Sequence, residues 1–213
     1  MLTGTVLEVL QHAAATGNSG ASNFGWGAGA GWANITGGHK QGKNVLAVGN
    51  LSDTDDLSSS SSRGPADDGR IKPDICAVGT AVYSTIDPNT YEDKTGTSMA
   101  CPGVAGSLAL LYEAYRDLYG SNPNAALMNA AVLNTADDLG NPGPDFKFGW
   151  GRINTRRAYQ LLEDGNWIES SVSNAETVSH TIEVPAGVSQ LRVMVYWTDY
   201  EGTPSASKAL IND

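Results

Sequence analysis

The sequence predicts an α/β domain in which a mostly parallel sheet carries helices on both faces. The first observation is an apolar run over 44–50, bounded by polar and Gly residues, which is typical of a strand buried on both faces. The second is a long segment after Thr97, whose apolar residues recur at helical spacing: Val104, Leu108, Leu111, Tyr112, Tyr115 and Leu118. The alternation of strand and helix patterns favours a layered α/β arrangement.

Further elements complete this expectation. Residues 1–16 are expected to form a strand or a helix-to-strand segment, and 83–85 a short strand. A helix is expected through about residue 135, with Asn122 as its N-cap and Pro123 at its first helical position. Another helix is expected over 155–164.

Composition and charge narrow the function classes. The chain has 213 residues, of which 40% are hydrophobic and 17% charged, as expected for a globular protein. Its net charge of −10 argues against a nucleic-acid partner, which would require a basic surface. The sequence has no run of eighteen apolar residues, so no membrane span is expected.

The sequence gives little support for a metal site or for a disulfide bond. Cys76 and Cys101 are too few for a disulfide framework and have no His or Cys neighbour at zinc-ligand spacing, so buried free thiols are expected. The acidic and serine-rich stretch 53–62 lacks the Asp-x-Asp-x-Asp-Gly spacing of a calcium loop. We therefore expect a solvated surface loop there; a structural calcium ion is possible but has no support in this stretch.

The stretch 95–106 carries the clearest chemical signal. A tight Gly-Thr turn leads directly into the small-residue-rich helix, with Ser98 at the helix start and Pro102 in its first turn. A Ser at this place is most often a simple N-cap. However, a helix N-terminus also supplies free N–H groups and a positive dipole end, which stabilise negative charge developing beside a hydroxyl.

The same residues resemble a known motif. Gly96-Thr97-Ser98-Met99-Ala100-x-Pro102-x-Val104-Ala105-Gly106 is similar to the nucleophile motif of subtilisin-like serine proteases, with departures at Cys101 and Gly103. The resemblance implies that Ser98 is the nucleophile of a serine endopeptidase that works through an acyl-enzyme. It also implies a protein or peptide substrate, no required cofactor, and a secreted or cell-envelope location.

A second stretch resembles the same family. Taken alone, Asn18 after a Gly is most often a turn residue. Ala15-Thr16-Gly17-Asn18 nevertheless resembles the family's small-small-Gly-Asn element, whose Asn donates to the oxyanion of the tetrahedral intermediate. The resemblance implies that Asn18 is catalytic and that five residues contact the substrate: Ala15, Thr16, Gly17, Gly96 and Thr97.

The Gly-rich stretch 20–43, with Phe24, Trp26 and Trp32, has two interpretations. Its aromatic residues cap the core under a long loop, or, as the resemblance implies, the stretch forms a wall of the pocket for the substrate side chain preceding the scissile bond. Small residues at 15–17 would leave this pocket room for a large apolar group. Segments 62–65, 72–79 and 148–154 also resemble the family, so the similarity covers roughly residues 13–160.

The rest of a catalytic triad is not recognisable. A serine nucleophile needs a base and an orienting carboxylate. None of His12, His39 and His180 stands in a His-Gly-Thr setting, and neither Asp-Thr-Gly nor Asp-Ser-Gly occurs. We therefore expect a fragment that lacks the N-terminal half of the catalytic domain and is inactive alone. The alternative is a non-catalytic peptide-binding or scaffolding relative.

The last part of the sequence changes character. Residues 181–184 and 191–197 alternate at period two and predict strands. We expect residues 1–166 to form the C-terminal part of the catalytic domain and 167–213 to begin a β-sandwich or jelly-roll module. A fragment of this kind would expose a sheet edge and apolar helix surfaces.

Overall fold

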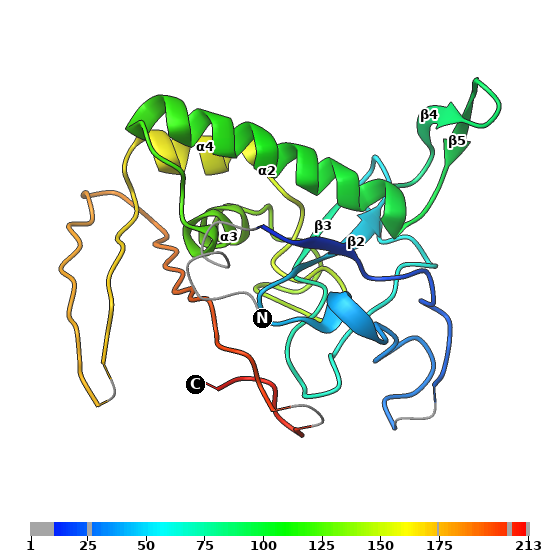
Figure 1. Cartoon of the computed structure of the whole chain (residues 1–213), viewed down its shortest axis with the longest axis horizontal. Coiled ribbons are helices and arrows are strands. Elements are labelled where there is room, and N and C mark those ends of the chain that lie inside the picture. Colours follow the sequence, from blue (N-terminus) through cyan, green and yellow to red (C-terminus); the bar gives the residue numbers. More distant parts are fainter. Residues whose placement is uncertain (1–10, 25–26, 174, 204–205, 212–213) are drawn as a thin grey trace.

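The computed structural model describes residues 11–24, 27–173, 175–203 and 206–211. The expectations for residues 1–10 and for Trp26 lie outside these ranges. The elements follow one another along the chain as shown in Figure 1. They are β1 (Ala13–Ala15), the 3₁₀ helix η1 (Gly38–Gln41), β2 (Leu46–Leu51), β3 (Ile75–Val78), β4 (Val82–Ile86), β5 (Thr90–Lys94), α2 (Thr97–Tyr119), α3 (Ala125–Asn134) and α4 (Thr155–Glu163).

Three parallel strands form the central sheet, in the order β1-β2-β3. Ala15 pairs with Val48, which in turn pairs with Ile75, so the carboxyl ends of the strands lie at one edge. Every residue of β2 is buried. This confirms the prediction of a strand with two covered faces in the 44–50 run, and places it at the centre of the sheet.

Helix α2 crosses the sheet and contacts all three strands (Figure 1). Its buried residues recur at three- and four-residue intervals, which aligns one face with the strands: Ala100, Val104, Leu108, Leu111 and Tyr115. The helix ends at Gly120, whose left-handed conformation (φ 70°) provides a C-cap. Helices α3 and α4 pack against α2 and against each other. The predicted α/β class with a parallel sheet is therefore confirmed.

Two element boundaries differ from the sequence expectation. Helix α3 begins at Ala125, so the N-cap is Asn124 and the prediction of Asn122 was wrong. The Asn124 side chain accepts a hydrogen bond from Ala126 N at 2.9 Å, which Asn122 lies too early to do. The strand predicted at 83–85 exists in β4, but it pairs with β5 in an exposed antiparallel hairpin that projects from the body (Figure 1).

The strands predicted at 181–184 and 191–197 are not formed among the described residues after 166. These segments run as extended chain, since neither finds the neighbouring strands that a stable sheet requires. The β-sandwich module is thus not confirmed, and the boundary at 166/167 stays a prediction.

The extended C-terminal chain is nevertheless attached to the α/β part. Arg192 donates to the Ala136 carbonyl at 3.0 Å, and Asn129 of α3 donates to the Tyr196 hydroxyl at 3.0 Å. Asp199 is 3% exposed and forms an ion pair of 2.7 Å with Lys43. Residues 192–199 therefore follow the surface of α3 and reach the segment that precedes β2.

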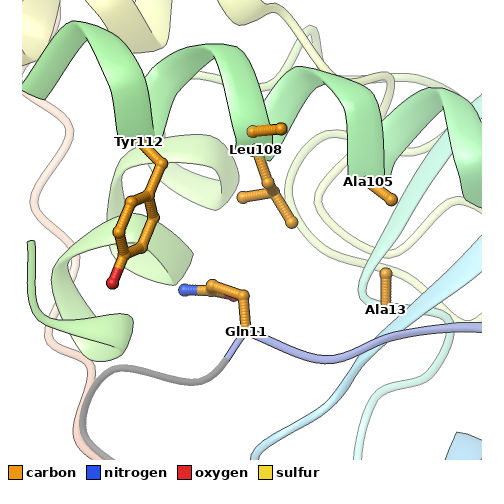
Figure 2. A pocket seen from close by; sticks show the side chains of 6 residues that line it. Gln11, Ala13, Ala105, Leu108 and Tyr112 are labelled. Atoms are coloured by element: carbon orange, nitrogen blue, oxygen red, sulfur yellow. The ribbon is translucent and has the colours of Figure 1, made fainter.

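The outer edge of the sheet is open in the described chain, because β1 pairs with β2 alone. Beside this edge lies a hollow of about 220 Å³ between β1 and α2 (Figure 2). Apolar and small side chains line most of it: Ala13, Ala105, Leu108, Ala109 and Tyr112. The expected exposed sheet edge is therefore present. Among the described helices, none is both long and apolar enough to cross a membrane.

We predict that Asp199→Asn weakens attachment of the C-terminal segment. The substitution leaves the Lys43 ammonium, which is largely shielded from solvent, without its carboxylate, and removing one partner of such a pair costs about 3 kcal/mol. Urea unfolding and limited proteolysis after residue 190 would measure the loss. Glu92→Gln is the matched control, because the Glu92–Lys94 pair is about half exposed and should contribute at most about 1 kcal/mol. Equal effects of the two variants would contradict the prediction.

Candidate active site

Ser98 lies at the second position of α2 and is exposed to solvent. The helix start is anchored on the end of β3, because Gly96 N donates to the Gly79 carbonyl at 2.9 Å. Gly79 fits closely below this turn: a Cβ there would lie 2.7 Å from Ala100 N and from the Gly96 carbonyl oxygen. This packing requires glycine at 79 and fixes the position of Ser98 relative to the sheet.

The other half of the site follows β1. Thr16 continues the pairing with β2 through Val48, and Gly17 then turns with φ 105°, a conformation that strains any residue with a side chain. This turn brings Asn18 to the carboxyl end of the sheet, beside Gly96. A Cβ at Gly96 would lie only 3.1 Å from Asn18 Nδ2. The two segments, about eighty residues apart in sequence, therefore meet through their glycines.

Thr97 connects the two halves. Its side chain is completely buried, and its hydroxyl accepts from Gly17 N at 3.1 Å and donates to Asn18 Oδ1 at 3.2 Å. The Thr97 backbone N–H also donates to Asn18 Oδ1, at 3.0 Å. Because Oδ1 accepts both bonds, the carboxamide is held in one orientation with Nδ2 on the opposite side.

Two N–H donors remain free at this place. Neither Asn18 Nδ2 nor the Ser98 backbone N–H has a hydrogen-bond acceptor within the described part of the chain. The Ser98 N–H belongs to the first turn of α2, where backbone donors have no intrahelical partner. An exposed hydroxyl with two free donors nearby can attack a carbonyl and bind the resulting oxyanion.

All seven site residues predicted from sequence meet at this edge of the sheet: Ala15, Thr16, Gly17, Asn18, Gly96, Thr97 and Ser98. Thr16 and Thr97 are fully buried, so their side chains are not presented at the surface.

The histidines lie elsewhere. His12 precedes β1 at its amino end, opposite Asn18, while His39 belongs to η1 and His180 to the C-terminal extended chain. Within the described residues no histidine is hydrogen-bonded to Ser98, and no group of three or more His, Cys, Asp or Glu side chains could hold a metal ion.

Sequence reasoning missed or misjudged several features near the site. Ser61 and Ser62 were expected in a solvated loop but are fully buried. The Ser62 hydroxyl accepts from Ser19 N, which fixes the turn after β1, and the Ser61 hydroxyl accepts from Asn50 N in β2. Asp55 of the same loop pairs with Arg152 at 2.7 Å. A run of serines does not indicate which side chains point into the protein, because this depends on backbone groups that lie far away in the sequence.

The two cysteines also differ from each other. Cys76 in β3 is fully buried, as expected, and burial raises the pKa of its thiol above the usual range. Cys101 is only half-buried, one turn after Ser98, and partial burial raises the pKa of its thiol as well. Both are free thiols with little thiolate character at neutral pH, so Ser98 is the better nucleophile candidate here.

The structure thus places an exposed serine at the start of α2, whose one face packs on the sheet, beside an Asn carboxamide held in one orientation. Comparison with known proteins identifies the family of this chain. Residues 8–151 match the family described as the subtilase family. The chain therefore belongs to the subtilases, a family of serine peptidases.

Individual relatives show the extent of the similarity. The chain is 35% identical to subtilisin DY of Bacillus licheniformis over 69% of this chain and 46% of that protein. It is 35% identical to thermitase of Thermoactinomyces vulgaris over 55% of this chain and 37% of that protein. It is 36% identical to the extracellular serine protease of Serratia marcescens over 54% of this chain and 12% of that protein. The chain thus spans less than half the length of each of these relatives.

We predict that Thr97→Val destabilises the junction while Thr97→Ser preserves it. Valine has nearly the same shape but leaves Gly17 N without its acceptor and Asn18 Oδ1 with one donor fewer, a loss of about 1–3 kcal/mol. Urea unfolding would measure it. Thr95→Val is the control, because the Thr95 hydroxyl accepts from Ala81 N in an exposed turn and should contribute less than about 1 kcal/mol. A Thr97→Val protein as stable as Thr97→Ser would disprove the role.

Proposed function

We propose that these residues form the nucleophile and oxyanion-binding part of a serine endopeptidase. Ser98 Oγ attacks the scissile carbonyl carbon, and the Ser98 N–H and Asn18 Nδ2 donate to the oxyanion that forms. The observation that carries the proposal is the pair of free donors beside an exposed hydroxyl, together with membership in a serine-peptidase family.

The proposal extends to the residues that flank Asn18 and Ser98. Thr97 orients the Asn18 carboxamide, so that no reorganisation is needed when charge develops on the substrate oxygen. Ala15, Thr16 and Gly17 form one wall of the pocket for the substrate residue preceding the scissile bond. Substrates are proteins or peptides, and the proposal requires no metal or organic cofactor.

Activation of Ser98 requires a histidine base and an orienting carboxylate. None of the three described histidines is hydrogen-bonded to it, so we propose that another polypeptide segment supplies both groups and packs at this edge of the domain.

By analogy with the extracellular protease of Serratia marcescens, we propose a secreted or cell-envelope location. A relative named as a membrane-bound protease, from Homo sapiens, is 35% identical over 55% of this chain.

A non-catalytic peptide-binding role is the second candidate. The observation that favours it is that no described histidine is hydrogen-bonded to Ser98. Peptide binding without cleavage, even when a segment carrying the base is present, would favour this role over catalysis.

We expect the 213-residue chain alone to react very slowly with a fluorophosphonate. Without a base, an active serine of this kind loses about 10⁶-fold in rate. The same chain combined with a segment that supplies the His and Asp should be labelled rapidly, and Ser98→Ala should abolish labelling, as mass spectrometry of the modified peptide would establish. Rapid labelling of the isolated chain, or labelling at another residue, would contradict the assignment.

We further expect Asn18→Ala to lower kcat with little change in KM once the base is present. The expected loss is about 10²–10³-fold, the magnitude measured for such a donor in a subtilisin. Steady-state kinetics on one peptide substrate would test it. A rise in KM at constant kcat would instead indicate that Asn18 binds substrate and transition state equally.

A further inference from the structure

Lys40, in the 3₁₀ helix η1, lies against the proposed pocket wall. A Cβ at Gly17 would be 2.9 Å from Lys40 Nζ and 3.2 Å from Ser62 Oγ. The Lys40 ammonium therefore occupies the space beside the glycine that follows Ala15 and Thr16. Motif spacing alone does not indicate this approach, since it arises from the fold of η1 against β1.

Three cations near η1 are paired with carboxylates, whereas Lys40 forms no ion pair among the described residues. Lys43 pairs with Asp199 at 2.7 Å, Arg70 with Asp68 at 2.6 Å, and Lys72 with Asp74 at 2.5 Å. Within the described ranges no carboxylate lies within 4.0 Å of Lys40 Nζ, although its side chain is half-buried. A partly buried cation without a counter-charge favours an incoming anion.

Lys40 also lies near the junction between Gly17 and Thr97. Gly17 N lies 3.1 Å from Thr97 Oγ1, and Thr97 directly precedes Ser98. Combined with the approach of Nζ to Gly17 and ordinary backbone dimensions, this places the ammonium within about 9 Å of Thr97 Oγ1. A side chain of moderate length on a substrate held at Ser98 can span such a distance.

We propose that Lys40 is a specificity-determining residue that pairs with an aspartate or glutamate side chain preceding the scissile bond. This rests on the proposed function of the site. Because Gly17 has no side chain, the ammonium can approach this wall closely, where it would favour a negatively charged substrate side chain over an apolar one. The pairing would be a charge-assisted hydrogen bond at the far end of the pocket.

The test compares peptides that differ in a single residue. The chain, combined with a segment that supplies the His and Asp, would be given peptide substrates with Glu, Gln or Lys before the scissile bond, and kcat/KM would be determined for each. In parallel, binding of two tetrapeptides ending in Glu or Gln would be measured by calorimetry, which needs no turnover. We expect both kcat/KM and affinity to favour Glu over Gln by about 10-fold or more.

Variants assign the preference to Lys40. Lys40→Gln should bring the Glu-to-Gln ratio to about one, and Lys40→Glu should favour the Lys peptide. Arg116→Gln is the control, because it removes one positive charge about 27 Å along α2 from Ser98. It should leave all ratios unchanged.

The outcomes separate the two proposals. Cleavage without a charge preference, or a preference that survives in Lys40→Gln, would overturn the role of Lys40 and leave the peptidase function intact. If no peptide were cleaved, the peptidase function would fail, and the calorimetric comparison of the Glu and Gln peptides would still decide whether Lys40 recognises an acidic residue.

Discussion

Thr97 joins the carboxyl end of β1 to the first turn of α2, and the geometry of the site depends on this junction. Its hydroxyl and backbone N–H together bind one backbone donor and one side-chain oxygen from the β1 segment. These bonds form in a fully buried position, where unmade hydrogen bonds are costly. The orientation of Asn18 and the separation of the two segments are thereby set together.

The junction can form only because the parallel sheet brings the two segments to the same edge. The register of the sheet places the end of β1 beside β2, and β2 beside β3. From β3 the chain runs through the β4–β5 hairpin to α2. A shift of one residue in either pairing would reverse the faces of the strand and separate Gly17 from Thr97. The geometry of this junction is therefore a property of sheet register as much as of the motif residues.

Much of this arrangement could be predicted from sequence, because the signals are local. The buried strand, the long helix and the position of Ser98 at its start follow from periodicity and from a contiguous motif. Asn18 was identified through its own short motif. The cap of α3 was misplaced by two residues, since Asn122 and Asn124 offer the same chemistry and only the backbone decides between them.

Features that depend on distant contacts could not be predicted. The inward rotation of Ser61 and Ser62 and the approach of Lys40 to Gly17 result from how loops fold over the sheet. The period-two pattern near residues 191–197 indicated strands, but Tyr196 instead packs at the core margin and bonds to Asn129. An alternating pattern indicates that one face of the segment is covered, but it does not tell whether a strand, a helix or a loop covers that face.

The left-handed turn at Gly17 has a consequence for how this site can change over evolutionary time. A residue with a side chain at 17 would be strained, and its Cβ would lie only 3.2 Å from the Oγ of the buried Ser62, so substitution at 17 is costly for folding. Residue 40 lies in a short surface helix that contributes no buried residue to the core, and many side chains can replace it without loss of stability. Changes at residue 40 could therefore alter the charge beside this turn while the turn itself stays in place.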